Sequence, residues 1–236
     1  MKYIALPDNQ IRRLSFYLAM EEYVARNIVA DDLFFMWQVR PTVIFGRNQS
    51  LENEVNTDYC REHGIEMYRR KSGGGCVYAD MSNVMCSFIT KDENVNLTFN
   101  RFINMMLLVL QKMGIEATST SHNDIMIGDR KVSGTAYYHL PGASIVHATL
   151  LYDTDMDHML HAITPSEQKL QSKGIRSVRQ RITLLKDHTA LSLDEVKASI
   201  RNNLCSGEQM LTPANVTSIE ALEQSYLDQD FINHLT

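Results

Sequence analysis

The chain has 236 residues, a formal net charge of −5, 44% hydrophobic residues and 22% charged residues. This composition is typical of a globular protein that can bury a sizeable core, so it excludes disordered, collagen-like and coiled-coil classes. No apolar stretch of about 18 residues occurs, so we expect neither a transmembrane helix nor a membrane partner. The acidic balance argues weakly against nucleic acid as a partner.

The first half of the chain predicts helices and strands in mixed order. Residues 14–26 have apolar side chains at helical spacing. Residues 99–113 form the clearest helix, with one apolar face and Gly114 as a stop signal. Between these helices, short apolar or alternating runs predict strands at residues 33–39, 42–45, 65–70 and 84–89.

The second half continues the mixed pattern. A hairpin with a Gly-Asp tip is expected at residues 125–132, and a long strand at residues 144–152. A short helix is expected at residues 155–163. The basic, weakly periodic segment at residues 164–186 indicates a loop.

The last part of the chain opens with a complete helix start. Ser192 and Glu195 have the spacing of a capping box, and Gly207 is expected to end the helix that follows. Residues 218–235 are expected to form one more short helix or the beginning of a small appendage. Runs of strands with helices at intervals favour an α+β fold over a doubly wound parallel sheet.

The cysteines are scattered along the chain, at Cys60, Cys76, Cys86 and Cys205. They form no C-x-x-C pair, so neither a zinc ribbon nor a redox dithiol is indicated. His158 and His161 lack a third ligand at matching spacing, and metal ligands are left unassigned. Scattered cysteines and an N-terminus without an apolar run of signal-peptide length predict a cytoplasmic protein.

Three successive glycines form the first chemical motif, in the run RRKSGGGCVY at residues 69–78. Glycine adopts backbone angles closed to other residues and lets another molecule approach the main chain. Successive N–H groups in such a loop can form an anion-binding nest, and the flanking cations favour phosphate. A Gly-rich turn with a solvated basic flank explains the same residues equally well. The run has neither the Walker A ending nor the dinucleotide spacing.

Two further motifs concentrate positive charge. Lys131 is expected on a strand just past a tight turn, beside small residues that leave room for a carboxylate or a phosphate. Spacing alone favours a surface lysine on an edge strand. Five cations cluster in the loop-like segment, at Lys169, Lys173, Arg176, Arg179 and Arg181. This segment either closes over an anionic ligand, meets an acidic partner or is a solvated loop.

Six short blocks in chain order form one larger pattern. They are LAMEEY at residues 18–23, WQ with PTVIFGRNQ at 37–49, RKSGGGCVY at 70–78, ND with RKVSGTA at 123–136, HATLL at 147–151 and KGIRSVRQR at 173–181. Together they resemble the lipoate–protein ligase A family of the biotin/lipoate ligase superfamily. Six ordered blocks are far more specific than one glycine loop.

The resemblance implies the fold of the biotin/lipoate ligase catalytic domain, which is similar to class II aminoacyl-tRNA synthetases and has mixed β-sheets flanked by helices. It assigns residues 1–190 to the catalytic domain and residues 191–236 to a C-terminal helical tail of the same domain. Family members often carry an accessory domain or obtain it from a separate protein. We expect a full accessory domain to be absent from this chain.

The resemblance also implies a two-step reaction. Lipoate and ATP, with Mg²⁺, give lipoyl-adenylate and pyrophosphate. The lipoyl group then passes to a lysine of a lipoyl carrier domain. Such carriers are E2 subunits of 2-oxoacid dehydrogenases and the glycine cleavage H protein.

The implied site has three parts, with Lys131 as the catalytic residue that contacts the lipoate carboxyl or the adenylate. The nucleotide would be held by Arg70, Ser72, Gly73, Gly74, Gly75, Cys76, Val77, Tyr78, Asn123, Asp124, Lys131, Ser133, Gly134, Thr135 and Ala136. The lipoate pocket would be lined by Lys131, Arg47, Val43, Phe45, Trp37, His147 and Thr149. A mobile loop over the adenylate would contribute Lys173, Arg176 and Arg179.

The sequence departs from the family pattern near the glycines. Cys76 replaces the usual alanine, and Ala79 stands where a histidine often precedes the aspartate. Two alternatives stay open. One is a cysteine-dependent octanoyl- or lipoyl-transferase of the same fold, although no cysteine occurs between Cys86 and Cys205, where its nucleophile would lie. The other is a non-catalytic lipoate-binding module, which Ala79 and a missing accessory domain would permit.

Overall fold

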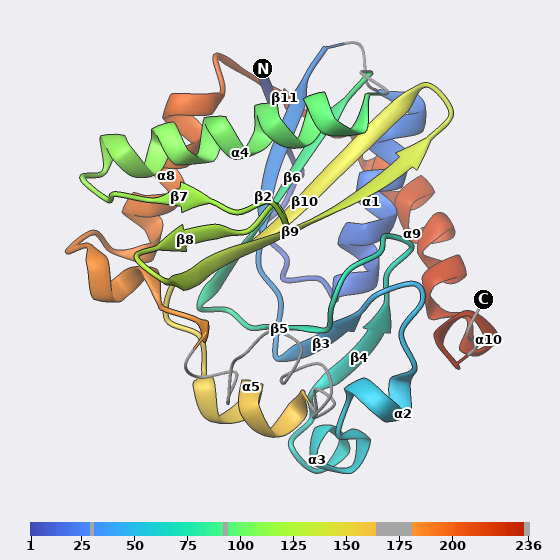
Figure 1. Ribbon diagram of the computed structural model, residues 1–236. Coiled ribbons are helices and arrows are strands. Elements are labelled where there is room, and N and C mark those ends of the chain that lie inside the picture. Colours follow the sequence, from blue (N-terminus) through green and yellow to red (C-terminus); the bar gives the residue numbers. More distant parts are fainter. Residues whose placement is uncertain (29–30, 92–93, 164–180, 234–236) are drawn as a thin grey trace.

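The computed structural model describes residues 1–28, 31–91, 94–163 and 181–233 (Figure 1). Within these ranges the main sheet has eight strands, in the order β11-β1-β2-β6-β10-β9-β8-β7. They are β1 (Lys2–Ala5), β2 (Leu33–Trp37), β6 (Asn83–Thr90), β7 (Thr118–Ser119), β8 (Ile125–Ile127), β9 (Arg130–Leu140), β10 (Ala143–Leu151) and β11 (Gly207–Met210). The sheet is mixed, because β1 runs parallel to both of its neighbours while the other pairs are antiparallel.

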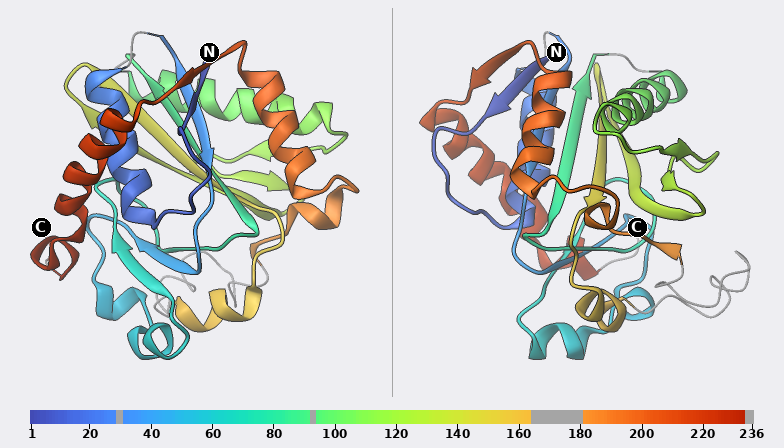
Figure 2. Two further views of the ribbon diagram at one scale, coloured as in Figure 1. Left: turned by 180° about the vertical axis from the view of Figure 1, so that it is seen from behind. Right: turned by 90° about the vertical axis from the view of Figure 1, so that its left-hand side faces the viewer.

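Helices cover both faces of the main sheet (Figure 2). They are α1 (Leu14–Asn27) and α9 (Pro213–Leu227) on one face, and α4 (Val95–Lys112) and α8 (Leu193–Leu204) on the other. Successive side chains of a strand point to opposite faces. Along β2, Phe35 and Trp37 therefore pack with α1, whereas Phe34 packs with α4. The central strand β6 is buried along its whole length.

A smaller sheet lies at one end of the main sheet (Figure 1). Its strands, in order, are β4 (Glu66–Arg69), β3 (Thr42–Phe45) and β5 (Val77–Ala79), with β3 parallel to β4 and antiparallel to β5. Its core includes residues from the short helices, which are α2 (Leu51–Glu54), α3 (Thr57–Glu62), α5 (Met156–Ala162) and α10 (Gln229–Asn233). A 3₁₀ turn, η1 (Leu185–His188), leads toward α8.

Most predicted elements are confirmed with small shifts at their ends. The predicted helices 14–26 and 99–113 correspond to α1 and α4, and the predicted hairpin 125–132 joins β8 to β9. The capping box is also confirmed. The Glu195 N–H donates to the Ser192 hydroxyl over 3.4 Å, and the Ser192 N–H donates to the Glu195 carboxylate over 2.7 Å.

Two predictions at the C-terminal end are wrong in detail. Gly207 does not end α8, because the helix stops at Leu204 with Cys205 as its C-cap, and Gly207 instead begins β11. The helix expected within residues 218–235 begins earlier, at Pro213, because Thr212 caps it. The short helix α10 then follows as a separate element.

The segment after residue 190 contributes to the sheet as well as to the helical layers. Its strand β11 pairs with β1, and α9 packs on α1. The division of the chain into domains stays a prediction. Within the part of the chain that the structure describes, none of the helices has the length and apolar character that a membrane crossing needs.

Candidate functional site

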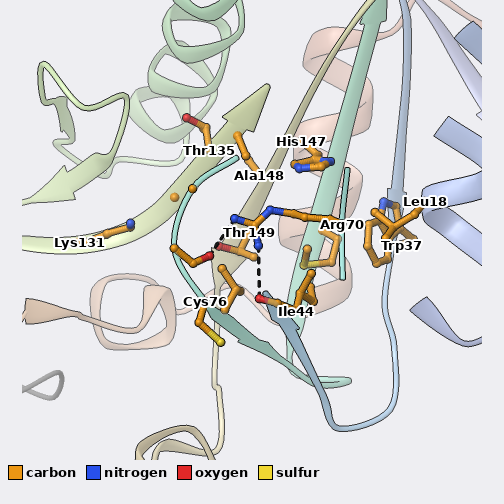
Figure 3. A pocket seen from close by; sticks show the side chains of 16 residues that line it. Leu18, Trp37, Ile44, Arg70, Cys76, Lys131, Thr135, His147, Ala148 and Thr149 are labelled. Carbon is orange, nitrogen blue, oxygen red and sulfur yellow. Dashed lines mark hydrogen bonds between the residues drawn. The ribbon is translucent and has the colours of Figure 1, made fainter. Parts of the chain in front are cut away.

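Two adjoining cavities lie beside the glycine loop, residues 70–76, which connects β4 to β5. The inner cavity has apolar side chains at one end, where Leu18 and Trp37 lie, and Lys131 at the opposite end (Figure 3). The outer cavity is more polar and includes Asp124 and Arg181. Both cavities are lined by Gly74, Gly75, Cys76, Val77, Lys131, Gly134, Thr135 and Thr149.

Arg70 shapes the glycine loop from inside. Its guanidinium donates to the Gly73 carbonyl over 2.7 Å. It also donates to the Gly75 carbonyl over 2.8 Å and to the Ile44 carbonyl over 3.2 Å (Figure 3). Burial lowers the pKa of Arg70 to about 10, so the side chain remains a cation at neutral pH. The Arg70 guanidinium therefore fixes the backbone of the loop, because its hydrogen bonds go to carbonyls of the protein itself.

Two glycine positions allow this loop to pack tightly. Gly74 has φ of +98°, a conformation that other residues rarely adopt. At Gly46, a Cβ atom would lie only 2.4 Å from the Gly74 carbonyl oxygen. Only a residue without a side chain therefore lets the segment after β3 touch the loop.

The other cations of the RRK run are also engaged with the protein. Arg69 is fully buried and donates to the carbonyls of Gly46, Arg47, Gln49 and Ile232. Lys71 forms an ion pair with Glu22 at 2.7 Å. The positive charge expected to attract phosphate thus stabilises the loop instead, and the cations that line the outer cavity are Lys131 and Arg181.

Lys131 stands where the two cavities meet. It lies on β9 just after the hairpin turn, and its Nζ pairs with Asp124 at 2.8 Å. Gly134 makes room for this side chain, because a Cβ atom there would lie 2.7 Å from the Lys131 Nζ. Asn123 holds the preceding turn with φ of 61°, and its carbonyl accepts from the Thr135 hydroxyl over 2.6 Å. The lysine is therefore positioned by its strand and by its neighbours.

Most predicted site residues come together around the cavities. The inner cavity is lined by Trp37, Arg70, Gly74, Gly75, Cys76, Val77, Lys131, Gly134, Thr135, Ala136, His147 and Thr149. Asp124 and Tyr78 line the outer cavity. Burial, followed by the charge of Asp80, raises the pKa of Tyr78, so its hydroxyl stays protonated.

Some predicted residues lie elsewhere, and here the expectation is corrected. Val43 and Phe45 belong to the core beneath the smaller sheet, and Ile44 lines the inner cavity instead, because successive strand residues point to opposite faces. Arg47 is exposed and lines neither cavity. The remaining residues outside both linings are Ser72, Gly73, Asn123 and Ser133.

The predicted loop cations Lys173, Arg176 and Arg179 lie outside the described residues. Arg181, the last of the five, lines the outer cavity. In the described part of the chain, no group of three or more histidines, cysteines, aspartates or glutamates could hold a metal ion.

Sequence reasoning missed a buried network behind the inner cavity. The Glu21 carboxylate accepts from the Ser87 hydroxyl over 2.5 Å and lies 3.0 Å from His147 Nδ1. The Trp37 indole N–H donates to the same serine over 2.8 Å, and His147 Nε2 lies 2.8 Å from the Ser72 hydroxyl. Two neighbouring glutamates inside an apolar helix pattern, in the run LAMEEY, were the signal that could have found it.

This arrangement suits an acid with a long apolar tail. The tail can lie against Trp37 and Leu18, and the carboxylate can reach Lys131 at the other end of the same cavity. The backbone of the glycine loop borders the outer cavity next to that lysine, where N–H groups can meet a phosphate. The site can therefore bring a carboxylate and a phosphate together beside one cation.

Comparisons with known proteins agree with this geometry. The family model of the lipoyl protein ligase A/B catalytic domain matches residues 14–205. Lipoate–protein ligase 1 of Staphylococcus aureus is 36% identical over 230 residues, which cover 94% of this chain and 70% of that protein. Lipoate–protein ligase LplJ of Bacillus subtilis is 38% identical over 178 residues, which cover 74% of this chain and only 54% of that protein.

A solved structure matches along nearly the whole length of both chains. It is a bipartite lipoate–protein ligase from Thermoplasma acidophilum, described together with its E2 lipoyl domain. Its TM-score is 0.86 at 25% identity, and the match covers 100% of this chain and 98% of that chain. The chain therefore belongs to the lipoyl protein ligase A/B catalytic domain family.

Proposed function

We propose that this protein activates lipoate with ATP to lipoyl-adenylate and transfers the lipoyl group to a lysine of a lipoyl carrier domain. The observation that carries the proposal is the pair of adjoining cavities with Lys131 at their junction. An apolar acid and a nucleotide can bind on the two sides of this lysine at the same time. The names of the relatives at 36% and 38% identity support the same activity.

In the first step, an oxygen of the lipoate carboxylate attacks the α-phosphorus of ATP, and pyrophosphate leaves. The Lys131 ammonium offsets the charge of both reacting groups, and N–H groups of the glycine loop can stabilise charge that develops on the phosphate. In the second step, the amine of the carrier lysine attacks the carbonyl carbon, and AMP leaves. Positioning and electrostatics supply the catalysis, so a covalent intermediate on the protein is not required.

Mg²⁺ and the protein partners belong to the same proposal. Mg²⁺ is usually held by one or two carboxylates together with substrate phosphates, so it would arrive with ATP. Asp124 in the outer cavity is a carboxylate within that region. We infer that the acceptors are E2 lipoyl domains and the glycine cleavage H protein, and that a separate accessory protein assists where activation is slow. The match to a bipartite ligase described with its E2 lipoyl domain supports the E2 lipoyl domain as an acceptor.

We also infer that the protein is located in the cytoplasm. None of the cysteines forms a disulfide, which suits a reducing compartment.

Release of pyrophosphate by the purified chain tests the proposed activity. With lipoate, ATP and magnesium but no carrier protein, we expect pyrophosphate release and a lipoyl-adenylate product that mass spectrometry detects. If none forms, synthetic lipoyl-adenylate and an apo lipoyl domain are supplied. Transfer in that second assay would show that activation needs an accessory protein. Failure of both assays would contradict the ligase function and favour a non-catalytic binding module.

Cys76 decides between the ligase and a cysteine-dependent transferase. Its side chain lines both cavities, so a thiol is close enough to the expected acyl group to be considered as a nucleophile. The thiols of Cys60 and Cys86 are buried, and burial raises their pKa to about 11 and about 12, which makes them poor nucleophiles. Under the adenylate mechanism no thioester forms.

We therefore expect Cys76→Ala to keep lipoylation within about twofold of the parent, because alanine is a smaller residue that leaves the loop backbone unchanged. Rates of carrier lipoylation are compared by intact mass. Complete loss of transfer in a stable Cys76→Ala protein, with a trapped thioester in the parent, would establish the transferase instead.

A further inference from the structure

Two neighbouring carboxylates on α1 reach the start of the glycine loop. Glu21 and Glu22 are each 3% exposed, although ionisable side chains are seldom buried unless they are paired. Each carboxylate is connected to a different residue of the loop, Glu22 to Lys71 and Glu21 to Ser72. Neither glutamate has a part in the chemistry proposed above, so their burial calls for another explanation.

The connection from Glu22 is direct. Its Oε2 lies 2.7 Å from the Lys71 Nζ and accepts from the Tyr226 hydroxyl of α9 over 2.9 Å. Arg26, one turn later on α1, donates to Oε1 over 2.8 Å. Burial disfavours the charged form of Glu22, but these donors outweigh it and lower the pKa of the carboxyl. Lys71 also lies 4.3 Å from the centre of the Tyr226 ring, a favourable cation–π distance.

The connection from Glu21 runs through His147 on β10. His147 Nδ1 lies 3.0 Å from Oε2 of the Glu21 carboxylate, within hydrogen-bond distance. On the other side of the ring, His147 Nε2 forms a hydrogen bond of 2.8 Å with the Ser72 hydroxyl. Because Ser87 donates to the other oxygen of Glu21, the carboxylate is held on both sides. The imidazole orientation, and with it the position of Ser72, is thereby fixed.

The loop needs such anchors because of its own sequence. Gly73, Gly74 and Gly75 follow at once, and glycine has more backbone freedom to lose than any other residue. A set of N–H groups stabilises a phosphate well only if it is already in place. Arg70 holds Gly73 and Gly75 from inside, but the start of the loop is tied to the helical layer through Lys71 and Ser72.

We propose that Glu21 and Glu22 are positioning residues for adenylation, which hold the start of the glycine loop through His147–Ser72 and through Lys71 so that its backbone is preorganised for the nucleotide phosphates. This inference rests on the proposed function. It explains why two consecutive residues of α1 are both buried carboxylates. It also gives Lys71 the role of an anchor, which is different from that of a phosphate ligand.

Glu223 offers a matched control on α9. This carboxylate is 4% exposed and also joins α9 to α1, because it accepts from Ser15 over 2.5 Å and from Arg13 over 2.8 Å. It does not contact the glycine loop. Glu223→Gln should therefore alter packing between the helices to a similar degree without releasing the loop.

The test measures loop motion and nucleotide use separately. Hydrogen–deuterium exchange of peptides that cover residues 70–78 is expected to speed up by about tenfold in Glu22→Gln and in Glu21→Gln, and to stay unchanged in Glu223→Gln. The KM for ATP in pyrophosphate release is expected to rise by about tenfold in the first two variants, with a smaller change in kcat. Unchanged loop exchange together with an unchanged KM for ATP would overturn the proposal.

Lys71→Met provides a second variant that should fold, because Glu22 keeps Arg26 and Tyr226 as partners. We expect the double variant Glu22→Gln/Lys71→Met to have the same KM for ATP as Lys71→Met alone. Both substitutions break the same connection, which is the ion pair between Glu22 and Lys71. Additive effects would show that Glu22 does not act through Lys71. If the parent protein shows neither activation nor transfer, the proposed function fails, whereas the exchange experiment still decides whether these glutamates hold the loop.

Discussion

Replacing Lys131 with alanine is expected to slow pyrophosphate release by roughly 10³-fold, the loss found when one preorganised charge-stabilising donor is removed from an active site. Lys131 is the cation that lines both described cavities. Without it, the lipoate carboxylate and the α-phosphate would approach each other without the ammonium that lies between the two cavities and offsets their like charges. The variant also leaves Asp124 without its 2.8 Å partner, so a negative charge would border the phosphate position.

The fold should survive this change. The Lys131–Asp124 pair is partly exposed, and exposed ion pairs contribute only about 0–1 kcal/mol to stability. Arg130→Ala serves as the matched control, because Arg130 is an exposed cation one residue away that lines neither cavity. Both activity and thermal unfolding are measured for the two variants. Normal turnover by a well-folded Lys131→Ala protein would remove this lysine from the mechanism.

Gly46→Ala is expected to destabilise the protein by about 1–3 kcal/mol, the usual cost of forcing extra atoms into a packed site. The new Cβ would lie 2.4 Å from the Gly74 carbonyl oxygen, so either the glycine loop or the segment after β3 must shift. For a protein of this size, each kcal/mol lowers the Tm by about 2–4 °C. A displaced loop would also misplace its N–H groups, and ATP-dependent activity should fall by about 10²-fold.

Gly73→Ala is the control for that prediction, and it lies inside the GGG motif itself. A Cβ at Gly73 meets no atom within 4 Å, and the residue does not have a positive φ. Its Tm in the absence of ligands should therefore match that of the parent. Calorimetry on both variants checks the pair, and equal stability of Gly46→Ala and the parent would show that the contact between the two segments is not tight.

The sequence predicted long, periodic elements well and short ones poorly. α4 and the hairpin of β8 and β9 were found because their apolar spacing and turn residues are local signals. β1 and β11 were not expected, since four-residue strands such as KYIA and GEQM have little pattern and pair only across the whole fold. The early start of α9 did have a local signal, the capping Thr212 before Pro213.

The site was predictable in its motif residues and less so in its geometry. The glycine loop and Lys131 do lie together, in agreement with the ordered blocks of sequence. The run TVIF of β3 is buried on both faces, so nothing local shows which face meets the cavity, and the sequence favours Val43 and Phe45 where the structure places Ile44. The engagement of Arg70 with three carbonyls depends on how β3 and the loop pack, which no spacing rule supplies.

The position of β1 between two parallel neighbours determines when each of its edges can pair during synthesis. Lys2 pairs with Leu33 on one side and with Gly207 on the other. On the ribosome, the first partner follows soon, whereas the second emerges only after α4 and α8 have been synthesised. Until then one side of β1 presents unpaired N–H and C=O groups, and such an open edge can pair with strands of other chains. Nascent chains stalled before β11 should therefore be the most prone to aggregate.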